Sequence, residues 1–319
     1  MKKFCVQLLF FLLPPIILAY SVDILISTKL KRSNNFAAFE YPIWNAIFEG
    51  KVDANVFIYG SSRAWVHINP QMIGENVGRP AYNFGVDGHN FGLQYLRHEM
   101  LLKYNKAPKV IIHSVDMFTL TRQKDLYNFQ QFLPYMFYNS ELNNYLLRYN
   151  GFKPMDFKIP MLRYRLAPVA IKEVLGQVSG LDANVPVRIN GFQAQDRVWD
   201  GKFEEAKRSL KVISVPIDPE MVKLFDDYLS DCQKRHIKVI LVYTPEYIEG
   251  QLFESNRNDV ISIYKDLAKK HDIPYLDYSK DPLTLDKKYF YNATHMNRVG
   301  TELFNMTLVA DLKKLPAFN

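Results

Sequence analysis

Two adjacent serines stand where a buried strand is expected to end. Residues 55–59 form a short apolar, β-rich run, and Gly60, Ser61 and Ser62 follow it directly. A glycine there lets the chain turn sharply, and a helix starting behind it would point free N–H groups at the hydroxyl. This arrangement suits a nucleophile whose reaction builds an oxyanion. A Gly-Ser-Ser turn also occurs as a plain helix cap, so the turn alone leaves both interpretations open.

Two further segments would bring polar groups to the same edge of a sheet. The stretch 83–90 reads Asn-Phe-Gly-Val-Asp-Gly-His-Asn, and its second glycine, Gly88, could expose a backbone N–H toward a bound anion. The strand-like run 109–115 would deliver Asp116 to the carboxyl edge. Ligands of open α/β sheets bind at that edge.

A histidine close to the C-terminus completes the set of reactive side chains. His295 lies within 290–297, just before an apolar helix that Asn297 would cap. By itself, a loop histidine is as easily a solvated side chain. Together with Ser62, it could instead act as the base of a serine nucleophile.

The elements that must position these residues alternate between strand-like and helix-like patterns. Continuous β-branched runs, rather than alternating ones, favour parallel strands that are buried on both faces. Helical stripes with three- and four-residue spacing occur over 221–232 and 260–267. This alternation predicts a three-layer α/β fold with a doubly wound, mostly parallel sheet. The expected strands are 55–59, 109–115, 238–243 and 274–278.

One long region breaks the alternation. From about 119 to 215 the chain is rich in Phe and Tyr and is interrupted by prolines, which predicts a helical insertion with its own small core. Such an insertion could also form a lid over a substrate cleft. The expected organisation is a signal anchor, a linker with lead-in, an α/β domain carrying the insertion, and a short tail, over 1–27, 28–51, 52–313 and 314–319.

The N-terminus has the features of an export signal. Lys2 and Lys3 precede an apolar stretch that runs from residue 4 to residue 20. The stretch is longer than a usual signal-peptide core and approaches the length that spans a bilayer. We expect a single-pass anchor with a cytoplasmic N-terminus and an extracytoplasmic, periplasmic domain. Secretion after cleavage near Ser21 and a buried helix of the domain are the alternatives.

Composition excludes several classes of protein. Of 319 residues, 23% are charged and 14% aromatic, which does not fit a disordered chain. Two cysteines can form neither a disulfide framework nor a thiolate zinc site. The net charge of +7 suits an anionic envelope, but a phosphate loop, a zinc finger and a basic helix are missing, so we expect no nucleic-acid partner. We expect no cofactor or metal.

These segments, in this order, resemble the SGNH (GDSL-like) hydrolase superfamily. More closely, they resemble its membrane-anchored, envelope-modifying branch, which includes proteins of D-alanyl-lipoteichoic acid synthesis and polysaccharide O-acetylation. The resemblance covers roughly 52–118 and 235–313 and leaves the insertion unmatched. It implies a flavodoxin-like sheet order and an enzyme that forms an acyl-serine. It also implies an acylated envelope polymer as substrate and a membrane-bound acyltransferase as a partner.

The resemblance assigns roles to individual residues. Ser62 matches the nucleophile of the Gly-x-Ser block, and Gly88 ends the second block, whose N–H would join that of Ser62 in an oxyanion hole. His295 matches the catalytic base. Arg63 and Asp116 are the remaining residues that we expect to face the substrate.

The sequence departs from the family pattern at two positions. The third block, usually Gly-x-Asn-Asp, reads His-Ser-Val-Asp over 113–116, so Val115 replaces a side-chain oxyanion donor. The aspartate three residues before the histidine is replaced by Asn292. A carboxylate there would fix the imidazole tautomer and stabilise the imidazolium, whereas asparagine can accept the Nδ1–H but brings no charge.

Three functions are compatible with these features. The first is an exported serine esterase or O-acyltransferase that acts on an envelope glycan or related polymer through Ser62, His295 and Asn292. The second is a non-catalytic binding or accessory protein that keeps the fold. The third is an unrelated membrane-tethered interaction domain.

Overall fold

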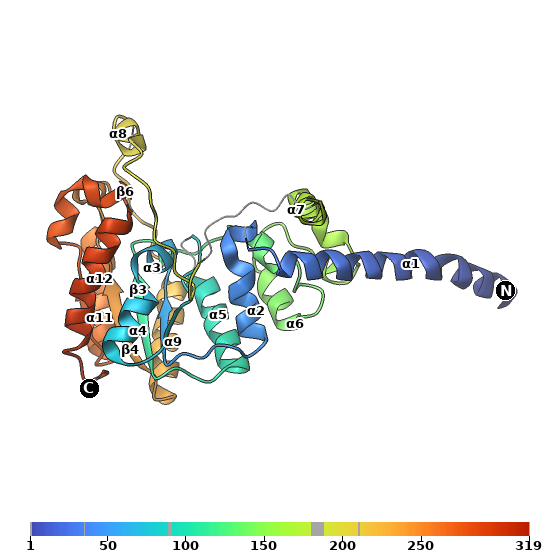
Figure 1. The fold of residues 1–319 in the computed structure, drawn as a ribbon, viewed down its shortest axis with the longest axis horizontal. Coiled ribbons are helices and arrows are strands. Elements are labelled where there is room, and N and C mark those ends of the chain that lie inside the picture. The colour runs from blue at the N-terminus through green and yellow to red at the C-terminus, as the bar shows by residue number, and fades with distance from the viewer. Residues whose placement is uncertain (1, 35, 89–90, 180–187, 210, 319) are drawn as a thin grey trace. The chain divides into compact units, whose positions relative to one another are not determined.

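A computed structural model describes most of the chain, which divides into two compact units. The described residues are 2–34, 36–88, 91–179, 188–209 and 211–318. Unit 1 comprises Met1–Ala46 and Lys124–Val187, and unit 2 comprises Ile47–Gln123 and Arg188–Asn319. Figure 1 follows the elements by colour along the chain.

Unit 2 contains a five-stranded parallel sheet with the strand order β2-β1-β3-β4-β5. This is the flavodoxin-like doubly wound order, so the predicted fold class is confirmed. The longer strands coincide with the apolar runs of the sequence, and β3 and β4 are paired along their whole length. The strands are β1 (Val56–Tyr59), β2 (Ala81–Asn83), β3 (Val110–Val115), β4 (Lys238–Tyr243) and β5 (Tyr275–Asp277).

Helices cover both faces of this sheet. Successive side chains of a strand point to opposite faces, so each strand contributes apolar groups to two helical layers. On one face, Ile58, Ile112 and Val242 pack in a core with Ile73 and Phe304. The helices of this layer are α3 (Ser62–His67), α4 (Pro70–Val77) and α12 (Arg298–Leu312).

The opposite face carries an aromatic core. His113 of β3 lies against Phe91 and Phe225, and Phe225 in turn contacts Tyr264. These residues come from α5 (Phe91–Tyr104), α9 (Pro219–Lys234) and α11 (Arg257–Lys270). The last two helices are those predicted from the periodic stripes.

Shorter elements complete unit 2 near the C-terminal edge of the sheet. β6 (Phe290–Asn292) and β7 (His295–Met296) form a small antiparallel ribbon that leads directly into α12. The remaining helices are α8 (Lys202–Lys207), α10 (Ile248–Gln251), η5 (Pro282–Leu285) and η6 (Lys287–Tyr289).

Unit 1 is helical and joins the N-terminus to the middle of the chain. Trp44 is fully buried, donates to the Gln131 amide oxygen at 2.8 Å, and packs against Phe132. Its elements are α1 (Lys2–Lys31), η1 (Phe36–Phe39), α2 (Glu40–Phe48), η2 (Phe129–Phe132), α6 (Ser140–Leu146), η3 (Pro154–Phe157), η4 (Leu162–Leu166) and α7 (Pro168–Val178).

This arrangement corrects two expected boundaries. The segment 28–51 is not a linker, because α1 continues to Lys31 and α2 buries Trp44 in the core of unit 1. The insertion is also shorter than 119–215. Only Lys124–Val187 joins the N-terminal helices, whereas the chain from Arg188 onward belongs to unit 2.

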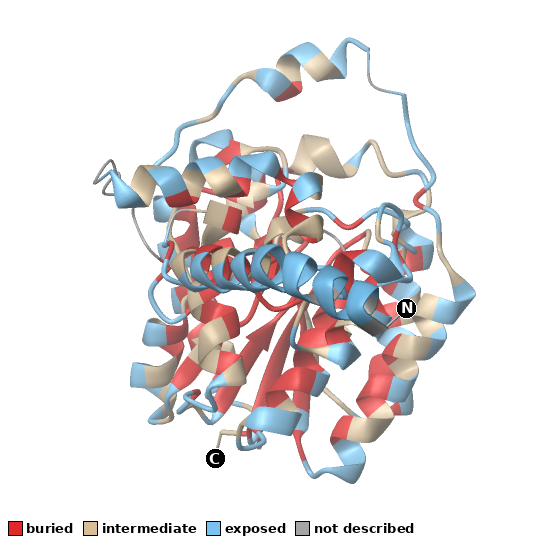
Figure 2. Cartoon of the chain, turned by 90° about the vertical axis from the view of Figure 1, so that its right-hand side faces the viewer, coloured by how far each residue is buried: buried red, intermediate tan, exposed pale blue. Residues whose placement is uncertain are grey.

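The N-terminal helix is long and apolar enough to span a membrane or to act as a signal anchor. An 18-residue stretch within Val6–Lys31 has a mean hydropathy of 2.2, and Pro14 and Pro15 lie inside the continuous helix. Figure 2 shows the N-terminal part of α1 as exposed, in contrast to the buried strands of the sheet.

Candidate active site

The turn after β1 holds the nucleophile candidates in place. Gly60 has a φ of +140°, and a Cβ there would lie 2.6 Å from the Ser114 carbonyl oxygen. Only glycine fits this turn without strain. Ser61 caps α3, because its hydroxyl accepts the Arg63 N–H at 3.3 Å. Ser62 then becomes the first residue of the helix.

Ser62, rather than Ser61, meets the C-terminal histidine. The Ser62 Oγ lies 2.8 Å from His295 Nε2, although 233 residues separate them. Ser62 is 8% exposed and Ser61 fully buried. The structure therefore brings together the two residues that the sequence paired as nucleophile and base.

Asn292 and Thr294 orient the imidazole from its other side. The Asn292 Oδ1 lies 3.1 Å from His295 Nδ1 and accepts the backbone N–H groups of His295 at 2.9 Å and Thr294 at 3.0 Å. Since two backbone donors point at this atom, it is the carbonyl oxygen of the amide. The Thr294 hydroxyl lies 2.9 Å from the same Nδ1. Sequence reasoning missed Thr294.

These contacts fix the tautomer that a serine base needs. With two oxygens facing Nδ1, that nitrogen carries the proton, and Nε2 is left to accept the Ser62 hydroxyl hydrogen. The orientation matches that of a serine triad, with a neutral amide in place of the usual carboxylate.

The segment after β2 is built around Asn83. Its side-chain amide donates to the carbonyls of Ala64 and Ile68, both at 2.8 Å, and its oxygen accepts the Gly85 N–H at 2.9 Å. Asn83 thus joins the segment to α3 and does not face the site. Gly88 follows with a φ of +87°, a left-handed conformation that favours glycine. Its predicted role in the oxyanion hole stays a prediction.

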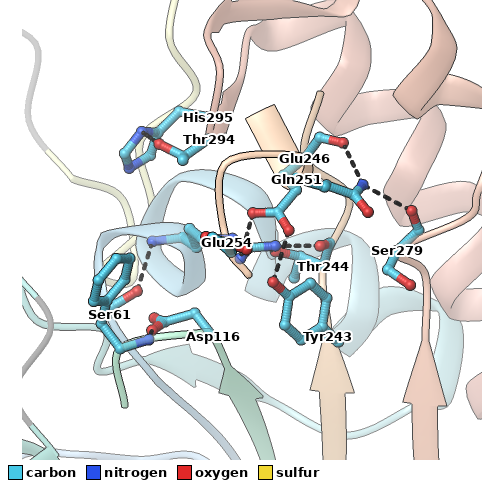
Figure 3. Close-up of polar contacts among 12 residues, drawn as sticks. Ser61, Asp116, Tyr243, Thr244, Glu246, Gln251, Glu254, Ser279, Thr294 and His295 are labelled. Carbon is cyan, nitrogen blue, oxygen red and sulfur yellow. Dashed lines mark hydrogen bonds and ion pairs between the residues drawn. The ribbon is translucent and has the colours of Figure 1, made fainter. Parts of the chain in front are cut away.

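Asp116 lies at the carboxyl end of β3, as expected, but it is 2% exposed. Its Oδ1 accepts the Phe118 N–H at 2.9 Å, and its backbone carbonyl accepts the Tyr264 hydroxyl at 2.7 Å. The side chain therefore closes a local turn beneath the Ser61 region (Figure 3). Val115 is fully buried and offers no polar side-chain atom.

Arg63 does not face a substrate, which corrects the prediction made for it. The side chain is 2% exposed and turns into the interior, where its guanidinium donates to Glu246 at 3.2 Å and to the Thr244 hydroxyl at 3.2 Å. It also donates to the Thr244 carbonyl and stacks over Tyr243. This position follows from helix geometry, because residues next to each other in a helix point in different directions.

A buried charge cluster continues behind Arg63, as Figure 3 shows for Tyr243, Glu246 and Glu254. Glu246 also accepts from the Tyr243 hydroxyl at 2.7 Å and from Arg257 at 2.5 Å. Arg257 is 2.7 Å from Glu254. Burial, together with the Glu246 charge, raises the pKa of Glu254 to about 7. Through Arg63, the cluster holds the start of α3.

His67 connects the C-terminal end of α3 to the β6–β7 ribbon, which contains His295. Its Nε2 accepts the Met296 N–H at 2.9 Å, and its Nδ1 lies 2.9 Å from the Thr244 hydroxyl. Burial lowers the pKa of His67 well below its ordinary value, with the Arg63 charge adding to the effect. A neutral His67 thereby connects the end of β4 to the residue that follows His295.

An extended segment, residues 188–200, runs along the site and is called the strap below. The Asn190 carbonyl accepts the Asn83 N–H at 2.8 Å, and the Gln193 N–H donates to the Trp65 carbonyl at 3.2 Å. Further along the strap, the Gln195 carbonyl accepts the Arg298 N–H at 2.9 Å. The strap thus connects β2, α3 and α12 around the Ser62–His295 pair.

The strap places an arginine over an aromatic ring beside the histidine. Tyr291 stacks on His295 with an interplanar angle of 14°, and the Arg197 guanidinium lies 4.5 Å from the Tyr291 ring centre. The sequence pattern does not predict the position of Arg197, because the strap is far from Tyr291 and His295 in the chain. Among the described residues, no group of three or more His, Cys, Asp or Glu side chains is placed to hold a metal ion.

Comparisons with known proteins give similarity at the level of three-dimensional structure alone. No family model matches the chain, and no curated protein matches it. An acetyl xylan esterase is 15% identical with a TM-score of 0.41, covering 81% of this chain and 99% of its own.

Two further solved structures are similar to the same degree. A protein from Streptococcus pneumonia described as a putative platelet activating factor is 13% identical with a TM-score of 0.39, covering 98% of this chain and 100% of its own. A protein of Bacteroides fragilis described as a putative acylhydrolase is 13% identical with a TM-score of 0.37, covering 88% and 99%.

Proposed function

We propose that the chain is a serine esterase or O-acyltransferase of the SGNH type. The observation that carries this proposal is the 2.8 Å contact between Ser62 Oγ and His295 Nε2, with Asn292 and Thr294 facing Nδ1. A nucleophile hydrogen-bonded to a base, and a base oriented by further oxygens, form the constellation that nucleophilic acyl transfer requires.

The reaction follows from these contacts. Ser62 Oγ attacks the ester carbonyl while His295 Nε2 takes the hydroxyl proton, which gives a tetrahedral oxyanion. The Ser62 N–H, in the first turn of α3 where no preceding helical carbonyl can accept it, would hold this oxygen together with the Gly88 N–H. His295 then returns the proton to the leaving alkoxide. Water or a second hydroxyl releases the acyl group from Ser62.

The proposed setting is the cell envelope. The apolar helix α1 and the two lysines at its start support a single-pass anchor with its N-terminus in the cytoplasm and unit 2 on the extracytoplasmic side. The proposed substrate is an acylated envelope glycan or related polymer. A membrane-bound acyltransferase is the proposed partner if the reaction is transfer rather than hydrolysis.

A second candidate function is a non-catalytic accessory protein with the same fold. Two observations favour it, namely the apolar Val115 where a side-chain oxyanion donor is expected and the uncharged Asn292 behind the histidine. Both features weaken the stabilisation of charge that develops in the transition state.

An activity-based probe separates the two candidates. A fluorophosphonate forms a stable adduct only with an activated serine, so the wild-type chain should be labelled and Ser62→Ala should not. Ser61→Ala is the matched control and should retain labelling. If the folded wild-type chain stays unlabelled and releases no acetate from acetylated glycan, the accessory function replaces the enzymatic one.

Membrane attachment is tested independently of catalysis. An anchored chain should keep its N-terminal residues and remain with the membrane fraction after a high-salt wash. Recovery of a soluble form that starts near Val22 would show that signal peptidase removes the helix.

A further inference from the structure

Helix α1 consists of two parts with opposite surroundings. Between Phe4 and Leu18 the large apolar side chains whose burial is described are 43–76% exposed. From Asp23 onward, one side of the same helix is buried in unit 1, and Leu30 is completely buried. The helix is therefore continuous, with an exposed apolar N-terminal part and a C-terminal part that is packed in the core of unit 1.

A buried ion pair marks the boundary between these parts. Arg163 donates to the two carboxylate oxygens of Asp23, each at 2.6 Å, and the Met161 N–H donates to the same group at 2.6 Å. One turn later, the Ser27 hydroxyl lies 2.8 Å from that of Tyr164. A carboxylate is costly in a bilayer, so a membrane-spanning stretch must end before Asp23.

Aromatic side chains gather just before this boundary. Tyr20 meets Phe137 edge to face at 5.5 Å, and Tyr138 meets Phe137 at 5.3 Å. The Arg163 guanidinium lies 5.4 Å from the Phe137 ring centre. Tyr20 is 40% exposed and Tyr138 60% exposed. Tyr20, Phe137 and Tyr138 are called the aromatic collar below.

We propose that the aromatic collar lies in the headgroup region of a lipid bilayer and seats unit 1 on the membrane surface. Tyrosine is enriched at this depth because its ring is apolar and its hydroxyl stays hydrated. The stretch 4–20 is about 26 Å long at a helical rise of about 1.5 Å per residue. That is close to the roughly 30 Å hydrocarbon core of a bilayer.

The continuity of α1 gives the collar a fixed depth. Since the helix enters unit 1 without a break at Tyr20–Asp23, the span and the collar cannot move independently. This inference rests on the proposal that α1 is retained as an anchor, but it requires no catalytic activity. It adds a second lipid contact, contributed by residues that follow α1 by more than a hundred positions.

Spin labels on the full-length chain test the collar directly. The chain, carrying Cys5→Ser, is reconstituted alone into phosphatidylcholine–phosphatidylglycerol vesicles, while the buried Cys232 stays unlabelled. A nitroxide is attached at Tyr138→Cys, or at Leu252→Cys as the control. Both parent side chains are exposed, at 60% and 72%, and Leu252 belongs to unit 2.

The label at position 138 should lose collisions with a water-soluble nickel chelate and gain collisions with oxygen on reconstitution. The label at 252 should stay fully accessible to nickel. If the chain sediments with the vesicles but the label at 138 remains as accessible to nickel as that at 252, the collar proposal is overturned while the anchor stands. If the chain does not sediment with them, both fail, and esterase labelling is unaffected by either result.

A second measurement avoids the cysteine label. In Tyr138→Trp, tryptophan fluorescence above the wild-type background should be quenched more by lipids brominated near the headgroup than by lipids brominated near the chain end. Absence of quenching by either lipid in the vesicle-bound protein would contradict the collar proposal.

Discussion

Asn292 is the residue whose chemistry most directly limits the proposed reaction. Its Oδ1 accepts two backbone N–H groups and faces His295 Nδ1, so a carboxylate could make the same bonds. Asn292→Asp should therefore keep the geometry and add a negative charge beside the developing imidazolium. A charge-assisted bond is stronger by about 1 kcal/mol, which predicts a roughly fivefold rise in kcat.

Steady-state hydrolysis of an aryl acetate measures this effect. Asn292→Ala serves as the control and should lose activity, because the amide oxygen that orients His295 disappears. A large fall in kcat for Asn292→Asp, with unchanged thermal unfolding, would contradict the orienting role of the carbonyl.

The two adjacent serines should separate into a structural and a chemical role. Ser61 caps α3, so Ser61→Ala should lower the free energy of unfolding by about 1 kcal/mol and keep turnover. Ser62→Ala should leave the melting temperature nearly unchanged and abolish acyl-enzyme formation. Mass spectrometry of the trapped acyl adduct decides the assignment, and an adduct on Ser61 would reverse it.

At the scale of elements, the short helix α3 is held by tertiary bonds, and those made by its own side chains reach the end of β4. Arg63 near its start and His67 at its end both bond Thr244, and His67 also receives the Met296 N–H. A six-residue helix has little stability of its own, so these tertiary bonds must hold Ser62 in register with His295.

Removing Arg63 should therefore affect both stability and turnover. Arg63→Met leaves Glu246 buried with one cation fewer, and breaking a buried pair in this way costs about 3–5 kcal/mol. We expect this loss in urea unfolding, together with a lower kcat at temperatures where the variant is folded. Arg122→Met is the matched control, because its ion pair with Asp218 is exposed and such pairs contribute little. Equal stability of the two variants would contradict the role assigned to the cluster.

The sequence predicted the elements that carry a continuous apolar signal and missed those that depend on distant contacts. β1, β3 and β4 follow their β-branched runs, whereas β2 (Ala81–Asn83) is too short to stand out after Pro80. Ser62 and His295 were predicted because the short blocks that contain them follow one another in the order typical of the SGNH superfamily. The buried position of Arg63 could not be predicted, since its partner Glu246 is 183 residues away.

At the scale of the whole molecule, chain segments far apart in sequence build each unit. The N-terminal helices and the inserted segment form unit 1, although β1 and β3 of unit 2 lie between them in the chain. Hydrophobic periodicity describes one segment at a time, so it cannot predict that the N-terminal helices pack with the inserted segment. The insertion was consequently expected to have a small core of its own, whereas it shares a core with the N-terminal helices.

Unit 2 also contains buried histidines that should make its stability depend on pH. Burial lowers the pKa of His98 to about 4 and that of His113 to about 3, and it lowers that of His67 well below the ordinary value. Below pH 6.5 the unfolded chain binds protons at these positions, and the folded chain does not. Stability should therefore fall as the pH is lowered from 6.5 toward 5.

Glu254 acts in the opposite direction and makes the free energy of unfolding depend less steeply on pH. With a pKa of about 7, its carboxyl keeps a proton in the folded state that the unfolded chain has released above about pH 4.5. On acidification the unfolded chain can bind three more protons than the folded chain at the histidines and one fewer at Glu254. The unfolded chain therefore binds up to two more protons in total. Since one proton corresponds to about 1.4 kcal/mol per pH unit, the free energy of unfolding should fall by up to about 3 kcal/mol per unit.

Urea unfolding of the full chain in detergent at pH 6.5, 6.0, 5.5 and 5.0 measures this slope. His113→Gln removes one of the three protons and should flatten the curve by about 1.4 kcal/mol per pH unit. Glutamine can still meet the partners of His113, the Tyr228 hydroxyl and the Gln94 side chain. His236→Gln, at an exposed position, should leave the slope unchanged. A wild-type stability that rises on acidification over this range would show that the buried histidines do not control the acid response of the fold.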